Sequence, residues 1–210
     1  MSQLTELFYT LSGVQHPQSY LETGCYQGLN IEKIISTNKY QEYHSIELSE
    51  QWYEYNRTRF SHRNNVFIHL GDSSTILGEI NSPSPKTIFL DAHYSGPGTA
   101  HGKLETPLLE ELSILASSNL DDDTVIIIDD IRMLGHKGLM PGNGHNYFSY
   151  DSDWSDITLE NIANIMGTSF TYLTNELSWL TEGPTDQLVV FKTSKDRGRA
   201  MEKLNELIKI

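Results

Sequence analysis

Short apolar runs alternate with longer amphipathic stretches along the 210-residue chain. The apolar runs predict seven strands, at residues 19–22, 44–47, 66–70, 87–90, 124–128, 170–173 and 188–191. Apolar residues at helical spacing predict helices over Ile31, Ile34 and Ile35, and at residues 50–60, 73–80, 107–117 and 158–166. Strands that alternate with helices of this size indicate right-handed βαβ units. We therefore expect one α/β domain with a doubly wound, mostly parallel seven-stranded sheet and helices on both faces.

Two stretches interrupt this alternation, and each follows a predicted strand. Residues 95–106 are rich in Gly and Pro, and residues 135–156 contain Gly, His, Tyr and Trp without a clear period. Ligands of open α/β sheets bind beyond the carboxyl ends of the strands, and long loops there are usually lids or binding loops. We expect residues 135–156 to be a loop or flap over the site of an acceptor molecule.

The two ends of the chain also carry a helical pattern. Residues 4–11 predict a leading helix, and residues 195–210 place Met201, Leu204, Leu207 and Ile208 at helical spacing. This amphipathic C-terminal tail can dock on the body of the protein or allow a homodimer.

Charge and cysteine content narrow the partners and the compartment. The chain has 15 Lys+Arg against 28 Asp+Glu, a formal net charge of −13. Such a surface repels phosphate backbones and anionic membranes, so we expect a small-molecule partner, no nucleic acid and no membrane. Cys25 is the one cysteine, which excludes an internal disulfide and fits a reducing compartment. The N-terminus lacks a basic region and a long apolar stretch, so we expect no signal peptide and a cytoplasmic location.

Acidic residues stand at the ends of the predicted strands. Glu22 opens the sequence Glu-Thr-Gly-Cys-Tyr-Gln-Gly, and Glu47 ends the second strand. Asp72, Asp91 and the pair Asp129-Asp130 follow the next three. A carboxylate at the tip of the second strand can accept hydrogen bonds from two ribose hydroxyls, and Asp72 can accept one from the amine of an adenine. The loop after the first strand contains no Lys or Arg that could bind a pyrophosphate. The acidic residues at the strand ends therefore favour an adenosine ligand with a charged tail that is not a phosphate.

Each of these features has a plain structural alternative. A Gly-x-x-x-Gly turn also closes a strand onto a helix in many α/β proteins. Asp72 and Ser73 can cap the helix that follows them, and Glu47 can be a solvated strand end. The occurrence of all three features in order favours the binding site.

The sequence resembles a known family over residues 19–132. Residues 22–28 are similar to the first motif of class I S-adenosylmethionine-dependent methyltransferases, with Tyr26 where many members have a middle glycine. The closest resemblance is to the macrocin O-methyltransferase group, which has an Asp after the fourth strand and an Asp-Asp after the fifth. Asp91 and Asp129-Asp130 match these positions. Residues 90–107 also resemble uncharacterised bacterial methyltransferase-like proteins. The resemblance implies a Rossmann-like fold.

The resemblance also implies a role for each matching residue. Glu22 would anchor the methionine end of S-adenosylmethionine, Glu47 the ribose, and Asp72 with Ser73 the adenine. The remaining implied cofactor-binding residues are Gly24, Tyr26, Gly28 and Asp91. A Mg²⁺ ion would be held by Asp91, Asp129 and Asp130, since hard oxygen ligands suit this cation.

An alcohol acceptor must lose a proton when it is methylated. His93, two residues from Asp91, is the first candidate for the catalytic base, and Asp91 is the second; His136 and His145 are further candidates. Aromatic side chains could stack on the acceptor or simply pack on the core: Tyr94, Tyr147, Tyr150 and Trp154. Trp52, Tyr53 and Tyr55 lie in a predicted helix, and we expect them in the core or at an interface.

The expected enzyme is thus an S-adenosylmethionine-dependent methyltransferase that O-methylates a small molecule or sugar with the help of Mg²⁺. Two alternatives remain open. The aspartates could hold a cation that binds a nucleotide-sugar diphosphate in a glycosyl-transfer enzyme, or the chain could be a cofactor-binding module without turnover.

Overall fold

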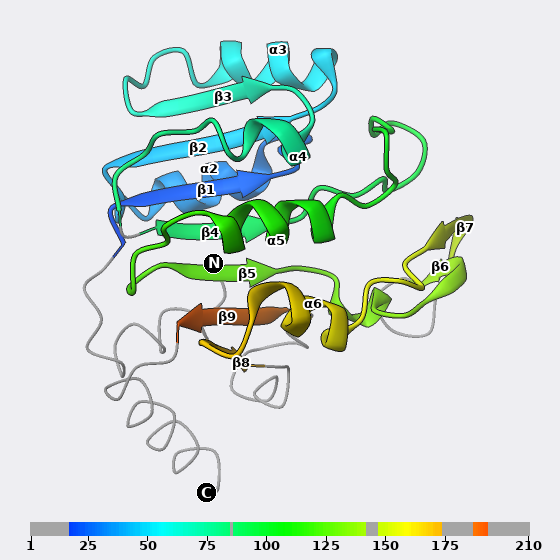
Figure 1. Cartoon of the computed structure of the whole chain (residues 1–210). Coiled ribbons are helices and arrows are strands. Elements are labelled where there is room, and N and C mark those ends of the chain that lie inside the picture. The colour runs from blue at the N-terminus through cyan, green and yellow to red at the C-terminus, as the bar shows by residue number, and fades with distance from the viewer. Residues whose placement is uncertain (1–16, 85, 142–146, 174–186, 193–210) are drawn as a thin grey trace, which may run out of the picture.

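A computed structural model of the chain describes residues 17–84, 86–141, 147–173 and 187–192. Its centre is a seven-stranded sheet in the order β3-β2-β1-β4-β5-β9-β8 (Figure 1). Six strands run in one direction, and β9 runs antiparallel to both of its neighbours. The prediction of a mostly parallel seven-stranded sheet is confirmed. Its strands are β1 (Ser19–Thr23), β2 (Glu42–Glu47), β3 (Val66–Leu70), β4 (Lys86–Leu90), β5 (Val125–Ile128), β8 (Phe170–Leu173) and β9 (Leu188–Lys192).

Helices cover both faces of the sheet (Figure 1). On one face lie α2 (Leu29–Ser36) and α3 (Glu50–Arg59). On the other lie α4 (Ser73–Ile76), α5 (Leu108–Ser117) and α6 (Leu159–Met166). Polar side chains fix three of the helix starts: Ser49, Asp72 and Thr158 each accept a hydrogen bond from a backbone N–H two or three residues later. Among the described residues, no helix is both long and apolar enough to cross a membrane.

The central strands are buried on both faces, as their sequences predict. All five residues of β1 and all four of β5 are buried, because each strand has helices above and below it. This packing holds the strands rigidly, so that their carboxyl ends form one fixed edge. Thr23 at the end of β1 lies opposite Ile46 of β2 and Leu90 of β4. The residues that follow these strands are therefore brought side by side.

Two segments extend the molecule beyond this edge (Figure 1). The first is the loop between β4 and α5. The second follows β5 and the short 3-10 helix Ile131–Met133, and it is an antiparallel hairpin of β6 (Lys137–Pro141) and β7 (Tyr147–Asp153).

The hairpin lies within residues 135–156, where the sequence predicted a loop or flap without regular strands. Burial alternates along β6: Leu139 is exposed, while its neighbour Met140 packs into the core. An ion pair between Lys137 and Asp153, which lie opposite each other, joins its strands. The predicted helix at 73–80 is also shorter, since α4 ends at Ile76. The predicted leading helix and C-terminal tail lie outside the described residues.

Candidate functional site

A cavity of about 290 Å³ lies at the carboxyl ends of β1 to β4. This is close to the lower end of the range for small-molecule sites. One wall comes from the strand tips and the start of α3, and the other from the loop that follows β4. The strand tips contribute Gly24, Tyr26, Glu47, Leu48, Gly71, Asp72, Ser73 and Asp91, and the β4–α5 loop contributes Ala92, His93, Tyr94, Ser95, Pro97, Thr99, Ala100, Gly102, Leu104, Glu105 and Pro107.

Glu47 is held in place by the loop that follows β1. The backbone N–H of Tyr26 donates to Glu47 Oε2 at 2.6 Å, and that of Ser49 donates to Oε1 at 2.7 Å. Burial raises the pKa of Glu47, while these backbone donors act in the opposite direction. The backbone N–H groups of Leu48 and Cys25 also lower the pKa of Glu47, so backbone donors hold this carboxylate at the edge of the cavity.

Tyr26 has the backbone conformation that glycine usually adopts. Its φ angle is +45°, in the left-handed region. This explains how a tyrosine can stand at the middle position of a glycine motif. Its ring packs edge-on against Trp52, with the ring centroids 4.7 Å apart. Both residues line the mouth of the cavity.

Gly24 and Gly28 serve different purposes. A Cβ atom on Gly24 would lie 2.4 Å from the carbonyl oxygen of Asp91, so this glycine lets the ends of β1 and β4 approach each other beside the cavity. A Cβ atom on Gly28 would lie 2.0 Å from Asn56 Oδ1. Gly28 does not line the cavity, and it permits the close packing of α2 against α3.

Asp72 and Ser73 lie together at the end of β3. Asp72 Oδ1 accepts hydrogen bonds from the backbone N–H and the hydroxyl of Ser74, which is the predicted helix cap. Its other oxygen, Oδ2, faces Gly102 of the β4–α5 loop, where a Cβ atom would be 3.3 Å away. Asp72 therefore caps α4 and also lines the cavity; the two interpretations are compatible.

Asp91, His93 and Asp130 form a compact cluster, in which one donor atom from each residue lies within 4.8 Å of the others. His93 Nδ1 is 3.5 Å from Asp91 Oδ1, and His93 Nε2 is 3.1 Å from Asp130 Oδ2. The Ser95 hydroxyl is 2.9 Å from the same His93 Nε2. Arg132 forms an ion pair with Asp130, whose φ angle of +58° turns its side chain into the cluster.

The electrostatics of this cluster favour a proton or a cation. Burial raises the pKa of Asp91 well above its usual value, and the charges of Asp129 and Asp130 raise it further. Burial lowers the pKa of His93, although Asp130 opposes this shift. His93 is therefore a neutral imidazole at pH 7, with a lone pair available for a proton or a metal ion.

The loop between β4 and α5 folds over the cavity. A hydrogen bond from the Tyr94 N–H to the Glu105 carbonyl, 2.8 Å long, closes its base. At its tip, Trp52 Nε1–H donates to the Gly98 carbonyl at 2.9 Å and ties the loop to α3. The cavity is thus roofed by a loop that the Trp52 hydrogen bond fastens to the opposite wall.

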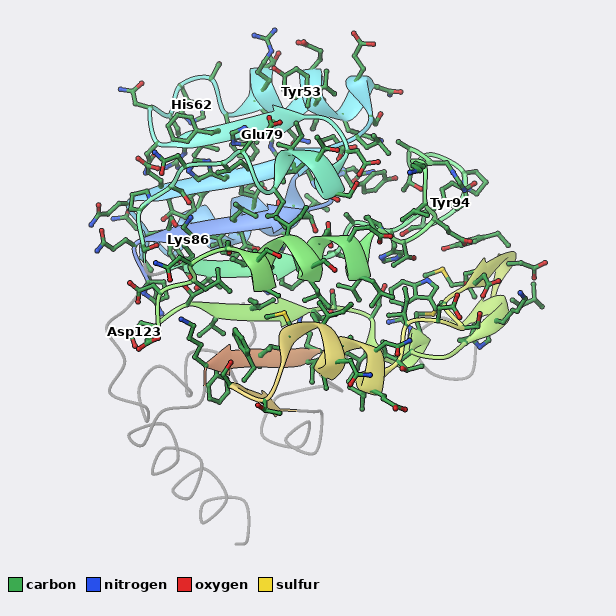
Figure 2. The ribbon with its side chains drawn as sticks, viewed as in Figure 1. Tyr53, His62, Glu79, Lys86, Tyr94 and Asp123 are labelled. Atoms are coloured by element: carbon green, nitrogen blue, oxygen red, sulfur yellow. The ribbon has the colours of Figure 1, made fainter. Side chains whose placement is uncertain are left out.

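The same loop also contacts the hairpin. Figure 2 shows Tyr94 on the loop, on the side of the hairpin; its ring centroid is 6.0 Å from that of Tyr150 in β7. The Tyr150 ring also packs on Gly96, where a Cβ atom would come within 2.6 Å of it. These two tyrosines, predicted as acceptor contacts or as packing, lie where the two projecting segments meet.

Several predicted site residues do not line the main cavity. Glu22 is 1% exposed and accepts hydrogen bonds from Asn30 Nδ2, the Ser45 hydroxyl and the Tyr20 hydroxyl. Asp129 lines a second, smaller cavity behind Asp91 and is outside the compact cluster.

The residues predicted in the loop at 135–156 also lie outside the main cavity where the structure describes them. His136 Nε2 lies 2.8 Å from the Leu139 carbonyl in the hairpin and does not line the main cavity. Trp154 is 3% exposed and packs edge-on against His93 as part of the core. His145 and the side chain of Tyr147 lie outside the described residues.

Sequence reasoning also missed residues. Trp52, expected in the core or at an interface, lines the cavity instead. Glu111 was not recognised, although a glutamate on the apolar face of a helix, between Leu108 and Leu115, is a readable signal. Thr23 Oγ1 accepts a hydrogen bond from the Asp91 N–H at 3.2 Å, a contact that depends on the pairing of β1 with β4 and is not visible in the sequence.

Comparison with known proteins shows similarity in structure only. No protein-family model and no curated protein matches the sequence. Among solved structures, a proposed rRNA methylase from Clostridium thermocellum aligns with a TM-score of 0.59 at 12% identity, over 92% of this chain and 98% of that one. The O-methyltransferase TomG from Streptomyces achromogenes, in complex with S-adenosylmethionine, aligns with a TM-score of 0.54 at 14% identity, over 91% and 80%. CalS10, an amino pentose methyltransferase from Micromonospora echinaspora, aligns with a TM-score of 0.55 at 14% identity, over 91% and 89%.

The fold is therefore the Rossmann-like fold of class I S-adenosylmethionine-dependent methyltransferases. The names of these neighbours span rRNA, amino sugar and other acceptors, so the fold alone does not select the acceptor. The resemblance to the macrocin O-methyltransferase group stays a prediction.

Proposed function

We propose that this protein is an S-adenosylmethionine-dependent methyltransferase that transfers a methyl group to a hydroxyl of a small molecule or sugar. The observation that carries the proposal is the convergence of Glu47, Asp72 and Asp91 on one cavity. These residues follow three different strands, and the structural neighbours of the fold use the same cofactor by name.

The lining of the cavity suits the charge of this cofactor. Its carboxylates are Glu47, Asp72, Asp91 and Glu105, and no lysine or arginine occurs among the described lining residues. A sulfonium cation is favoured in such a cavity, whereas a diphosphate is repelled. Glu47 would receive the ribose hydroxyls, and Asp72 the adenine amine. Glu22 is enclosed by its own partners and would act on the methionine end only through Asn30 or Ser45.

The cluster at Asp91 fits a divalent cation in its donor set. Two carboxylates meet the preference of Mg²⁺ for oxygen, and the imidazole of His93 would also suit Mn²⁺ or Zn²⁺. We propose that Asp91 and Asp130 hold this cation, with Asp129 as a further candidate ligand. A bound cation would lower the pKa of an acceptor hydroxyl and orient its oxygen.

The chemical step needs a base and an alignment. When bound, S-adenosylmethionine would supply a methyl group for in-line transfer to the acceptor oxygen, with its sulfur leaving as a thioether. The His93 imidazole would take the hydroxyl proton, and Asp130, 3.1 Å from its Nε2, would stabilise the imidazolium that forms. The roof provided by the β4–α5 loop would exclude water and hold the cofactor in line with the acceptor.

A binding experiment tests the proposal and separates it from its alternatives. Calorimetry should show S-adenosylhomocysteine binding with a micromolar Kd, and UDP should not bind. A preference for UDP would favour the glycosyl-transfer alternative, and no binding of S-adenosylhomocysteine at millimolar concentration would refute the proposal. If Asp130→Asn and His93→Gln leave the biological activity intact while the cofactor still binds, the chain is a binding module without turnover.

A further inference from the structure

Glu111 is a buried carboxylate that the proposed reaction does not use. It lies on α5 among Leu108, Leu112 and Leu115, and it is 1% exposed. Burying a carboxyl group in apolar surroundings is unfavourable unless its neighbours compensate for the lost water. The position therefore calls for a reason other than packing.

Two hydroxyl groups from different strand ends meet at this carboxylate. Thr23, at the end of β1, and Ser73, at the start of α4, both hydrogen-bond to the Glu111 side chain. Thr23 Oγ1 also accepts the backbone N–H of Asp91 at 3.2 Å. Ser73 lines the cavity beside Asp72. Glu111 thus links the strand tip that carries Asp91 to the strand tip that carries Asp72.

The second oxygen of Glu111 is directed elsewhere. Oε1 has no hydrogen-bond partner within the described part of the chain, and neither has the buried hydroxyl of Thr106. Both residues line the small cavity behind Asp91, together with Asp129. Its volume of about 10 Å³ is close to what a single water molecule needs. Glu111 is therefore connected to Asp91 in two ways. It hydrogen-bonds to Thr23, which accepts the Asp91 N–H, and it lines the small cavity that Asp91 also lines.

We propose that Glu111 is a positioning residue that fixes Ser73 and Thr23 relative to each other, and so holds the adenine-binding and methyl-transfer ends of the site in register. The inference rests on the proposed cofactor. Burial raises the pKa of Glu111 to about 7, which shows that the surroundings disfavour its charge. A carboxyl group at an apolar helix position needs such partners, and here both partners stand at the strand ends that form the site.

Substitution by leucine separates the two roles. Glu111→Leu removes the link but fills the same apolar position, so we expect the melting temperature to stay the same or rise. The Kd for S-adenosylhomocysteine, measured by calorimetry, should increase at least tenfold. Glu111→Gln keeps one oxygen and a donor for the two hydroxyls, and its Kd should stay within threefold of the wild type. Glu110→Leu, at the exposed neighbouring position, is the matched control and should leave the Kd unchanged.

Other outcomes would overturn the inference. An unchanged Kd in Glu111→Leu refutes a positioning role, and a Kd that rises together with a large fall in melting temperature, not rescued by Glu111→Gln, shows a structural role only. If Glu111→Leu does not fold, Thr23→Val and Ser73→Ala each remove one of the two hydroxyl groups that hydrogen-bond to Glu111. Each should weaken binding at least threefold, and no effect in both refutes the proposal. If the wild type itself does not bind S-adenosylhomocysteine, the proposed function fails instead.

Discussion

Gly24 and Asp91 meet backbone to backbone, with only 2.4 Å between the Asp91 carbonyl oxygen and the place where a Cβ atom of residue 24 would lie. The φ angle of Gly24 is +82°, so any other residue would be strained as well as crowded.

We expect Gly24→Ala to separate the ends of β1 and β4 and to abolish cofactor binding. The left-handed backbone alone costs about 1 kcal/mol, and the clash with backbone atoms adds to it. Gly135→Ala is the control, since Gly135 has a φ angle of +71° but nothing within 4 Å of its Cβ position. Urea unfolding and calorimetry with S-adenosylhomocysteine measure both effects. Equal losses in the two variants would show that the close approach is unimportant.

Glu47 should determine the affinity for the ribose. Glu47→Gln replaces one acceptor oxygen with an NH₂ group that faces a backbone N–H of Tyr26 or Ser49. We expect the Kd for S-adenosylhomocysteine to rise at least tenfold. Glu50→Gln, which alters an exposed residue of α3, should bind as the wild type does. The ratio of the Kd of Glu47→Gln to that of the wild type should be smaller for a 2′-deoxy analogue than for S-adenosylhomocysteine. An equal ratio for the two ligands would argue against a ribose contact.

The buried Glu22 should make stability depend on pH. Burial raises its pKa from 4.5 to about 7, so the folded state binds the proton more tightly than the unfolded state. Its favourable contribution is complete below pH 4.5 and is lost as the pH rises to about 7. Relative to wild type, Glu22→Gln should gain stability over this range, by at most about 3 kcal/mol. Urea unfolding between pH 4.5 and 8 measures the difference, and a difference independent of pH would contradict the assignment.

The hydrogen bond from Trp52 to Gly98 should control the opening of the β4–α5 loop. Trp52→Phe keeps an aromatic ring against Tyr26 but removes the Nε1–H donor. We expect S-adenosylhomocysteine to dissociate three- to tenfold faster, with little change in melting temperature. Tyr55→Phe, at a half-exposed position next to Trp52, is the control. An unchanged dissociation rate in stopped-flow experiments would mean that the loop is held by other contacts.

His93 should act on turnover and not on cofactor affinity. His93→Gln removes the proposed base, so turnover should fall at least a hundredfold while the Kd for S-adenosylhomocysteine stays within threefold. Because burial lowers the pKa of His93, the wild type should lose activity only below pH 6.5, where the imidazole becomes protonated. His101→Gln, on the exposed side of the loop, is the control. Parallel losses in turnover and affinity would assign His93 to binding.

The pattern of apolar runs predicts the fold because the central strands are buried on both faces, which favours apolar residues along most of their length, as in β5. The same pattern places Glu47, Asp72 and Asp91 directly after strands, and parallel strands carry their ends to one edge.

The contacts that the sequence did not reveal depend on tertiary packing. Glu22 precedes the glycine loop as the motif requires, yet Tyr20, Asn30 and Ser45 enclose it. Trp52 belongs to a helix whose amphipathic pattern is weak, and only the path of the β4–α5 loop brings Gly98 to it. The hairpin was missed because apolar and polar residues do not alternate in the sequences of its strands, which form a ribbon outside the main sheet.

The contact between Gly96 and the Tyr150 ring has a consequence for engineering the two projecting segments. Because Gly96 has no side chain, the Tyr150 ring of the hairpin can pack directly on the β4–α5 loop. The two segments are therefore complementary in shape at this point. Transplanting the hairpin into a scaffold with a bulkier residue at position 96 would displace the ring from the β4–α5 loop. A graft of either segment should therefore exchange both segments together.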